Sequence, residues 1–134
     1  MSNEADSPNV AVVRSIYQAF ARGDVDAVLG RLDPAVRWTE ADGFPYAGTY
    51  VGPQAVLDGV FARLGTDWEG FRAVPEELID GSDTVVAVGE YGGTFRETGR
   101  AFAAPFAHIW RLEDGRVVRF RQFTDTALVR EALP

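Results

Sequence analysis

The stretch APFAHIWRLEDGRVVRFRQFTDTA, residues 104–127, decides how this chain folds. Asp114-Gly115 at its centre is a strong signal for a two-residue hairpin turn, because both residue types tolerate the positive φ that the turn needs. The segments on either side, near residues 101–112 and 117–125, are expected to be strands, and each of their two faces is half apolar. With Asp114 and Gly115 at the tip, Glu113 faces Arg116 and Leu112 faces Val117. The stretch therefore predicts two long antiparallel strands.

Uninterrupted counting from the turn divides the hairpin into two faces, because side chains alternate across a strand. The first face pairs Ile109 with Phe120, Ala107 with Gln122 and Pro105 with Thr124. The second pairs Trp110 with Arg119, His108 with Arg121, Phe106 with Phe123 and Ala104 with Asp125. The first face suits a pocket wall, and the second suits an exposed or subunit-contact surface. A one-residue bulge would exchange these assignments beyond it.

The rest of the chain predicts helices before strands. Helix signals define three segments, from Ser7-Pro8 to Gly23, from Asp24 to Asp33-Pro34, and from Gly52-Pro53 to Gly65. Strands are expected over residues 35–40 and near 70–80, 84–96, 101–112 and 117–125, with a loop over 41–52 and a short helix near 126–133. This order predicts an α+β fold, with the helices on one side of an antiparallel sheet.

Composition narrows the class of protein. The chain has 134 residues, which fits one domain over residues 1–134, with residues 1–7 as a frayed tail. It has no cysteine and one histidine, which argues against disulfides and the usual metal sites. Its net charge of −7 opposes binding to nucleic acid or anionic membranes. No membrane-spanning run or targeting signal is visible, so a cytoplasmic protein is expected.

Glu40 is the best candidate for chemistry. In Ala35–Glu40 the side chains alternate, so Glu40 falls on the same face as Val36 and Trp38. A carboxylate desolvated beside tryptophan has a raised pKa, which suits a general acid or base near neutral pH. The simpler alternative is a glutamate at the strand end that turns into solvent.

Other polar and aromatic residues are candidates for the same pocket. Asp125 is a second catalytic candidate, although it could simply cap the C-terminal helix. Other residues could bind a ligand, either by hydrogen bonds or as part of an apolar pocket wall. They are Tyr17, Trp38, Tyr50, Ile109, Phe120, Gln122 and Thr124. His108, the one histidine, lies off the pocket face in the uninterrupted register. No metal motif or dinucleotide fingerprint is visible, so neither a metal nor a cofactor is expected.

Three stretches resemble one known superfamily: VVRSIYQAFARGDVDAVLGRLDPAVRW at residues 12–38, YAGTYVGPQAV at 46–56, and residues 104–127. The chain resembles ketosteroid isomerase-like proteins, and most of all the SnoaL-like polyketide cyclase branch of the nuclear-transport-factor-two-like fold. The resemblance implies a cone-shaped, curved antiparallel sheet wrapped around an apolar pocket, with three helices of the N-terminal half on one side. It also implies a homodimer formed through the outer sheet face.

The same resemblance assigns some residues and leaves others unmatched. Glu40 matches the general-base aspartate of ketosteroid isomerases, and Asp125 resembles the aspartate that ends the last strand in cyclase-like members. The oxyanion-hole tyrosine of the isomerases falls at Ile16, with Tyr17 adjacent, and their second oxyanion donor falls at Ala107. Both oxyanion donors are therefore missing from the matched positions.

These observations lead to one expected function and two alternatives. The expected function is a small, cofactor-free isomerase- or cyclase-like enzyme that moves a proton on a hydrophobic, carbonyl-bearing molecule. Glu40 would move the proton, and Tyr17, Gln122 or Thr124 would steady the oxyanion. The alternatives are a non-catalytic binder of a small hydrophobic ligand, and an interaction module that uses the sheet face of Trp110, Arg119 and Arg121.

Overall fold

A computed structural model describes residues 6–134, in which helices and two short strands lead into four long strands. The helical segments are α1 (Pro8–Ala21), α2 (Val25–Leu29), α3 (Pro53–Val56), the π-helical segment η1 (Leu57–Phe61), α4 (Ala62–Asp67) and α5 (Thr126–Arg130). The strands are β1 (Leu32–Glu40), β2 (Gly48–Val51), β3 (Trp68–Gly81), β4 (Thr84–Phe95), β5 (Ala101–Glu113) and β6 (Arg116–Thr124). The tail was expected over residues 1–7, and its residues 1–5 lie outside the described residues. No helix within residues 6–134 is both long and apolar enough to cross a membrane.

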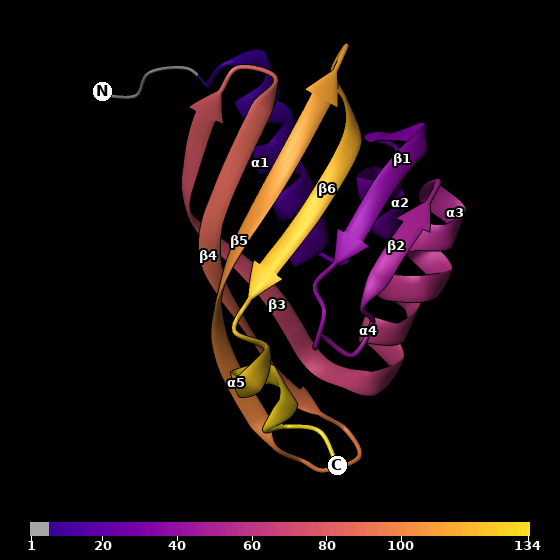
Figure 1. Cartoon of the computed structure of the whole chain (residues 1–134), viewed down its shortest axis with the longest axis vertical. Helices are drawn as coiled ribbons and strands as arrows, with labels where there is room; N and C mark the ends of the chain where they lie inside the picture. Colours follow the sequence, from indigo (N-terminus) through magenta and orange to yellow (C-terminus); the bar gives the residue numbers. More distant parts are fainter. Residues whose placement is uncertain (1–5) are drawn as a thin grey trace.

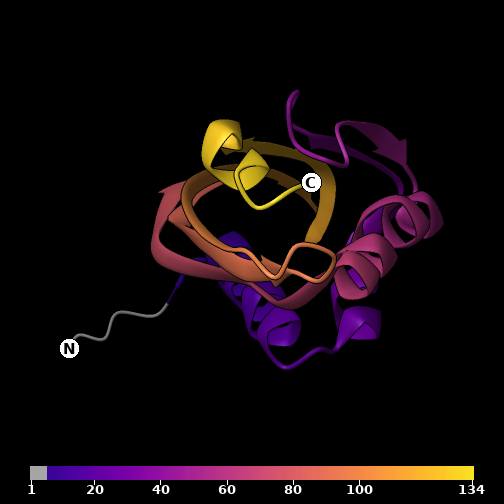
Figure 2. The same cartoon turned by 90° about the horizontal axis from the view of Figure 1, so that it is seen from below.

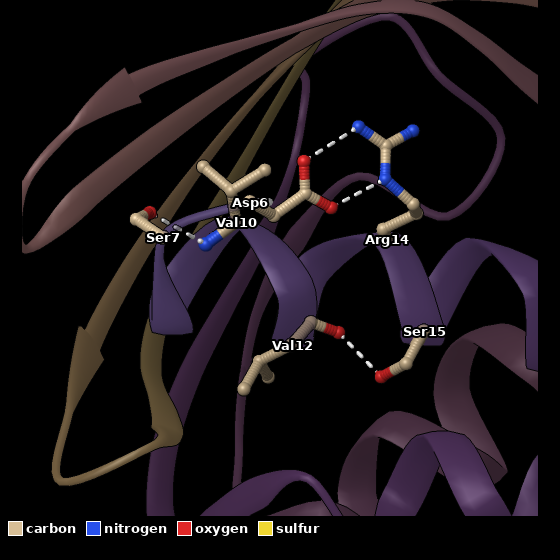
Figure 3. Close-up of polar contacts among 6 residues, drawn as sticks. All are labelled: Asp6, Ser7, Val10, Val12, Arg14 and Ser15. Atoms are coloured by element: carbon tan, nitrogen blue, oxygen red, sulfur yellow. Dashed lines mark hydrogen bonds and ion pairs between the residues drawn. The ribbon is translucent and has the colours of Figure 1, made fainter. Parts of the chain in front are cut away.

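Helix α1 begins where the sequence predicts. The Ser7 hydroxyl accepts a hydrogen bond from the Val10 backbone N–H at 3.3 Å, and Pro8 occupies the first turn. The Asp6 carboxylate accepts two hydrogen bonds from the Arg14 guanidinium, at 2.7 and 3.1 Å, as Figure 3 shows. Asp6 and Ser7, which were expected in the frayed tail, are therefore held against the first turns of α1.

Helix α2 is shorter than predicted. It begins with Asp24 as N-cap, as expected, but ends at Leu29, and β1 already begins at Leu32. The expected helix end at Asp33-Pro34 is therefore wrong. The proline is tolerated inside β1 because it lies in the gap of the β1–β6 pairing between Leu32 and Arg37, where no ladder hydrogen bond is lost.

The third predicted helix continues to Asp67 through α3, η1 and α4, so its predicted end at Gly65 is also wrong. Glycine permits a helix stop but does not force one. Here the chain stays helical until Trp68, which is 1% exposed and opens β3. Asp67 is fixed by the Tyr46 hydroxyl, which donates to its carboxylate at 2.6 Å.

The six strands form one curved sheet that does not close, in the order β2-β1-β6-β5-β4-β3 (Figure 1). The expectation of an antiparallel sheet holds for every neighbouring pair except β1 and β6, which run parallel. Seen along its long axis, the sheet curls around the core, with the N-terminal helices along one side and α5 over the lower end (Figure 2).

The register of the β5–β6 hairpin changes within four residues of the turn. Glu113 pairs with Arg116 and Leu112 with Val117, as predicted, but Arg111 then pairs with Arg119, which leaves Val118 as an extra residue in β6. This is a β-bulge, which inserts one unpaired residue into a strand.

Beyond the bulge, the predicted pairing is wrong, and so is the predicted facing of β5, while Phe120 and Gln122 of β6 face the cavity as predicted. Trp110 pairs with Phe120 and His108 with Gln122, and all four side chains are buried. The physical reason is the spacing of apolar residues in β6. Without the bulge, burial of Val117 would bring two arginines inward and turn Phe120 outward, so the extra residue puts both apolar side chains in the core.

Loss of the α1 N-cap offers a test of this part of the fold. Ser7→Ala is expected to lower the free energy of unfolding by about 1 kcal/mol, since it removes the acceptor of the Val10 N–H, and Ser7→Asp should retain most of the stability. Ser15→Ala is the matched control, because Ser15 donates to the Val12 carbonyl at 2.6 Å within the same helix (Figure 3). Urea unfolding would measure all three variants. Equal losses for Ser7→Ala and Ser15→Ala would contradict the assignment.

Candidate functional site

The inner face of the sheet, α1 and η1 surround a cavity in which the centres of water-sized molecules have about 50 Å³ of room. All the space between its protein atoms, the opening to solvent included, is about 480 Å³. Its lining is mostly apolar and aromatic, with Trp38, Phe61, Trp110 and Phe120 among the largest side chains. The polar side chains in the lining are Tyr17, Glu40, Tyr91, His108 and Gln122. A mostly apolar cavity with a few convergent polar groups is typical of a small-molecule site.

Glu40 reaches this cavity from the end of β1. Alternation along the strand buries Val36, Trp38 and Glu40 on one face, as the sequence predicts. The Trp38 indole N–H donates to the Glu40 carboxylate oxygen Oε2 at 3.0 Å. Trp38 in turn stacks on Phe120 from β6, with ring centroids 3.8 Å apart. The carboxylate is therefore held in one orientation by a tryptophan that is itself fixed by packing.

Burial changes the chemistry of Glu40. Only 4% of the residue is exposed, and loss of hydration raises the pKa of its carboxyl group from 4.5 to about 8, although the hydrogen bond from Trp38 lowers the pKa somewhat. A carboxyl group with a pKa this close to neutrality has both protonation states accessible, as a proton-transferring group requires.

A row of hydrogen-bonded side chains crosses the cavity wall from α1 to β6, the strand that pairs with β1. The Trp110 indole N–H donates to the Tyr17 hydroxyl at 3.0 Å, and that hydroxyl bonds to His108 Nδ1 at 2.5 Å. The other imidazole nitrogen, Nε2, bonds to the Tyr91 hydroxyl. Gln122 Nε2 donates to the same Tyr91 oxygen at 3.0 Å. We call Tyr17, His108 and Tyr91 the Tyr-His-Tyr array.

All three members of the array are electrically neutral near neutral pH. Burial lowers the pKa of His108 to about 3, so the imidazole carries a single proton. Burial also raises the pKa of Tyr17 well above its usual range. The pKa of Tyr91 is raised first by burial and then by the nearby charge of Glu40. The two phenols are therefore hydrogen-bond donors that keep their protons.

Five of the residues predicted for the site lie together at the cavity: Glu40, Tyr17, Trp38, Phe120 and Gln122. Their placement agrees with the sequence prediction, while their roles in binding or chemistry stay predictions.

The other four predicted residues do not line the cavity. Asp125 is exposed and caps α5, where its carboxylate accepts the Leu128 N–H at 3.2 Å. Thr124 donates to the Pro105 carbonyl at 2.8 Å. Tyr50 donates to the Tyr46 carbonyl at 2.9 Å. Ile109 lies on the outer sheet face, because the bulge reverses the predicted facing.

Sequence reasoning missed two members of the array. His108 was placed off the pocket face, because an uninterrupted register was assumed, and the bulge turns it inward. Tyr91 was not singled out, since it lies in the glycine-rich segment Gly89–Gly93 of β4. The signal that could have found the bulge is that either predicted hairpin face was only half apolar. Ala107, which the resemblance matched to an oxyanion donor, points away from the cavity.

A metal site in the described part of the chain would need several side chains that bind the ion together. Within residues 6–134, no three histidine, aspartate or glutamate side chains lie close enough to hold a metal ion.

The buried Glu40 carboxyl group predicts an unusual pH dependence of stability. Its pKa is raised in the folded state, so between about pH 4.5 and about 8 the folded protein binds more protons than the unfolded chain, and stability falls as pH rises. Relative to wild type, Glu40→Gln is expected to gain on the order of 1 kcal/mol per pH unit across this window. Urea unfolding at several pH values would measure it. The exposed Glu90→Gln is the control, and pH curves of wild type and Glu40→Gln that run parallel would contradict the raised pKa.

Comparison with known proteins identifies the family. The family profile described as SnoaL-like domain matches residues 13–120. An NTF2-like protein from Burkholderia thailandensis is 42% identical, with a TM-score of 0.92, over 97% of this chain and 99% of that chain. An NTF2-like protein of unknown function from Burkholderia pseudomallei is 34% identical, with a TM-score of 0.88, over 96% of this chain and 98% of that chain.

A further solved structure carries a ligand. TerC, co-crystallised with polyporic acid, is 28% identical, with a TM-score of 0.84, over 94% of this chain and 98% of that chain. No curated protein matches the chain. The matched profile, the curved sheet and the helices of the N-terminal half agree with the resemblance seen in the sequence, and the chain belongs to the SnoaL-like domain family.

Proposed function

We propose that this protein is a cofactor-free enzyme that transfers a proton on a small, hydrophobic, carbonyl-bearing molecule, in the manner of an isomerase or cyclase. The observation that carries the proposal is the position of Glu40. It is a buried carboxyl group with a pKa of about 8, and it shares an aromatic cavity with a row of neutral hydrogen-bond donors. Among residues 6–134, no basic side chain forms an ion pair with this carboxylate. A buried carboxylate with only a structural role would normally be paired with such a side chain.

The proposed reaction uses Glu40 in both directions. The ionised carboxylate removes a proton from the carbon next to the carbonyl group, and the electron pair of that C–H bond moves toward the carbonyl oxygen, which becomes an enolate. A hydroxyl hydrogen of the Tyr-His-Tyr array donates to this oxygen, whose charge is greater in the transition state than in the ground state. Glu40, now protonated, returns the proton to another atom of the substrate.

The apolar lining supports this assignment of roles. A carboxylate in a desolvated site is a stronger base than one in water, because its charged form is disfavoured. The phenols of Tyr17 and Tyr91 keep their protons, so they stabilise an oxyanion by hydrogen bonding rather than by protonating it.

The structure of a relative supports a small-molecule ligand. TerC, at 28% identity, was co-crystallised with polyporic acid. Polyporic acid is therefore a reasonable first probe for binding to this chain.

Substitution of Glu40 tests the proposal. Wild-type protein is expected to catalyse exchange of the α-protons of at least one member of a panel of small aromatic ketones in D₂O. Glu40→Gln should lower that rate by about 10²–10⁴-fold, since it removes the general base. The wild-type rate should rise with pH to a plateau above about 8, because only the ionised carboxylate accepts the proton. NMR of the ketone protons would follow the reaction.

Glu90→Gln is the matched control for this experiment, because Glu90 is exposed on β4 next to Tyr91 and outside the cavity. Equal exchange rates for Glu40→Gln and wild type would refute Glu40 as the base. Binding of polyporic acid without exchange of any ketone would favour the non-catalytic binder.

We also propose that the chain forms a homodimer through the outer sheet face. Val88, Ala107 and Phe123 are cross-strand neighbours in a row over β4, β5 and β6 on this face. Val88 is 36% exposed and Phe123 is 49% exposed. The interaction-module alternative named a different set, and Trp110 of that set is 2% exposed in the core, so that surface does not exist as predicted.

A charge in this row tests the dimer. Val88→Arg is expected to raise the dimer dissociation constant at least about tenfold, because an arginine at the centre of an apolar interface loses hydration without a partner. Val51→Arg is the control, since Val51 is 56% exposed on the edge strand β2. Sedimentation velocity at several concentrations would measure both variants. A wild-type protein that is monomeric throughout would refute the dimer.

A further inference from the structure

The Tyr-His-Tyr array contains one hydrogen more than its own bonds can use. Neutral Tyr17, His108 and Tyr91 together carry one hydrogen on each of the two phenols and one on the imidazole. The array has two internal links, one at each ring nitrogen of His108. Each link uses one hydrogen, so the third remains on one of the two phenol oxygens.

The outer neighbours of the array cannot accept this hydrogen. At the α1 end, the Trp110 indole N–H is a donor only. At the other end, the Ala41 backbone N–H donates to Gln122 Oε1 at 2.9 Å, which fixes the amide so that its NH₂ group faces Tyr91. Both phenol oxygens therefore receive an N–H hydrogen bond from outside the array. The third hydroxyl hydrogen is left for the cavity that both tyrosines line.

The histidine tautomer decides which tyrosine holds that hydrogen. With the proton on Nε2, His108 donates to Tyr91 and accepts from Tyr17, so the unshared hydroxyl hydrogen is on Tyr91. With the proton on Nδ1, His108 donates to Tyr17 and accepts from Tyr91, so the unshared hydrogen is on Tyr17. Exchange between the two arrangements moves the imidazole proton from one ring nitrogen to the other by exchange with water, while each phenol keeps its own hydrogen and its hydroxyl group rotates. This exchange changes no net charge.

Packing holds the imidazole in a fixed plane while this exchange takes place. Phe106 stacks on His108 with ring centroids 4.1 Å apart, and Phe120 meets the same ring at 62° with centroids 4.8 Å apart. A ring flip would break both phenol bonds against these neighbours. The tautomers therefore interconvert by exchange of the imidazole proton with water and rotation of the two hydroxyl groups, rather than by rotation of the ring.

Glu40 biases the position of the unshared hydrogen. Glu40 lies at the Tyr91 end of the array, because the N–H of the next residue, Ala41, bonds to Gln122, whose amide donates to Tyr91. The charge of Glu40 is also among the causes that disfavour an ionised Tyr91 phenol. A negative carboxylate attracts the positive end of a hydroxyl dipole. The ionised form of Glu40 thus favours an unshared hydrogen on Tyr91, and this bias disappears once Glu40 is protonated.

We infer that Tyr17, His108 and Tyr91 act as a neutral tautomeric relay that delivers one hydroxyl donor to a ligand oxygen, and that the protonation state of Glu40 sets which tyrosine supplies it. This inference deepens the proposed function, since it names Tyr17 and Tyr91 as the alternative oxyanion donors and His108 as their positioning residue. It also defines the ligand chemistry: the array offers its unshared donor to a ligand that presents an acceptor oxygen, such as a carbonyl or an enolate.

The single histidine of the chain allows a direct test. Protein made without a histidine tag and labelled with ¹⁵N-histidine gives one imidazole, whose two nitrogen shifts report the tautomer. The titratable side chains that share the cavity with His108 are Tyr17 from α1, Tyr91 from β4 and Glu40 from β1. The residues facing it from β6, Phe120 and Gln122, do not titrate.

At about pH 9, where Glu40 is mostly ionised, wild-type His108 is expected mainly as the Nε2–H tautomer. In Glu40→Gln the ratio of Nε2–H to Nδ1–H is expected to fall at least about threefold, because the charge is gone. Wild type at about pH 6 should move in the same direction. Tyr91→Phe should abolish this response to Glu40. Tyr50→Phe, which removes a phenol hydroxyl outside the array, should preserve it.

The outcomes separate the relay from the proposed function. An unchanged tautomer ratio between wild type and Glu40→Gln overturns the relay, even if Glu40→Gln has lost ketone exchange. Two N–H groups on His108 at neutral pH also overturn it, since the array would then lack a single unshared hydrogen. A Glu40-dependent tautomer in a protein that exchanges no ketone supports the relay and refutes only the proposed enzyme.

Discussion

One extra residue in β6, Val118, determines which side chains reach the interior of this protein. The bulge lets Val117 and Phe120 both face inward, and beyond it the pairing of β6 with β5 is shifted by one residue. As a result His108 and Gln122 are cross-strand neighbours on the inner face, while the arginines of β6 lie outside or at the surface. Without that shift, the cavity would have charged walls and no hydrogen-bonded array. The site depends on this single irregularity of the backbone.

The inner face of the sheet carries polar groups among aromatic side chains, and each of these buried polar groups needs a hydrogen-bond partner. A buried hydroxyl, amide or imidazole without a hydrogen bond costs stability. Among the described residues, no buried side-chain nitrogen or oxygen lacks a partner. The indole N–H groups of Trp38 and Trp110 act as donors at the cavity, one to Glu40 and one to Tyr17. The aromatic core therefore provides packing and also fixes the orientation of the polar groups.

Electrostatic coupling links Glu40 with the Tyr-His-Tyr array. Burial favours the neutral form of every ionisable group there, which raises the pKa of Glu40 and of both tyrosines and lowers that of His108. Only Glu40 then has a pKa near neutrality, so it is the one group that changes charge under ordinary conditions. A single change of charge in a low-dielectric cavity has a large effect on neighbouring dipoles. The protonation state of Glu40 therefore has the largest effect on the electrostatics of the site.

The sequence determined the helix starts, the hairpin turn and the inward position of Glu40, because these depend on local rules of capping, turn geometry and alternation along one strand. It also carried the family resemblance, and with it the curved sheet around a pocket. Only the tertiary structure decided the parallel contact of β1 with β6, the end of α2 and the positions of His108 and Tyr91. These depend on how strands from distant parts of the chain pair and on where a bulge relieves a conflict between alternation and burial. Residues near a turn have their register set by that turn, whereas residues farther along a strand have it set by the core they must fill.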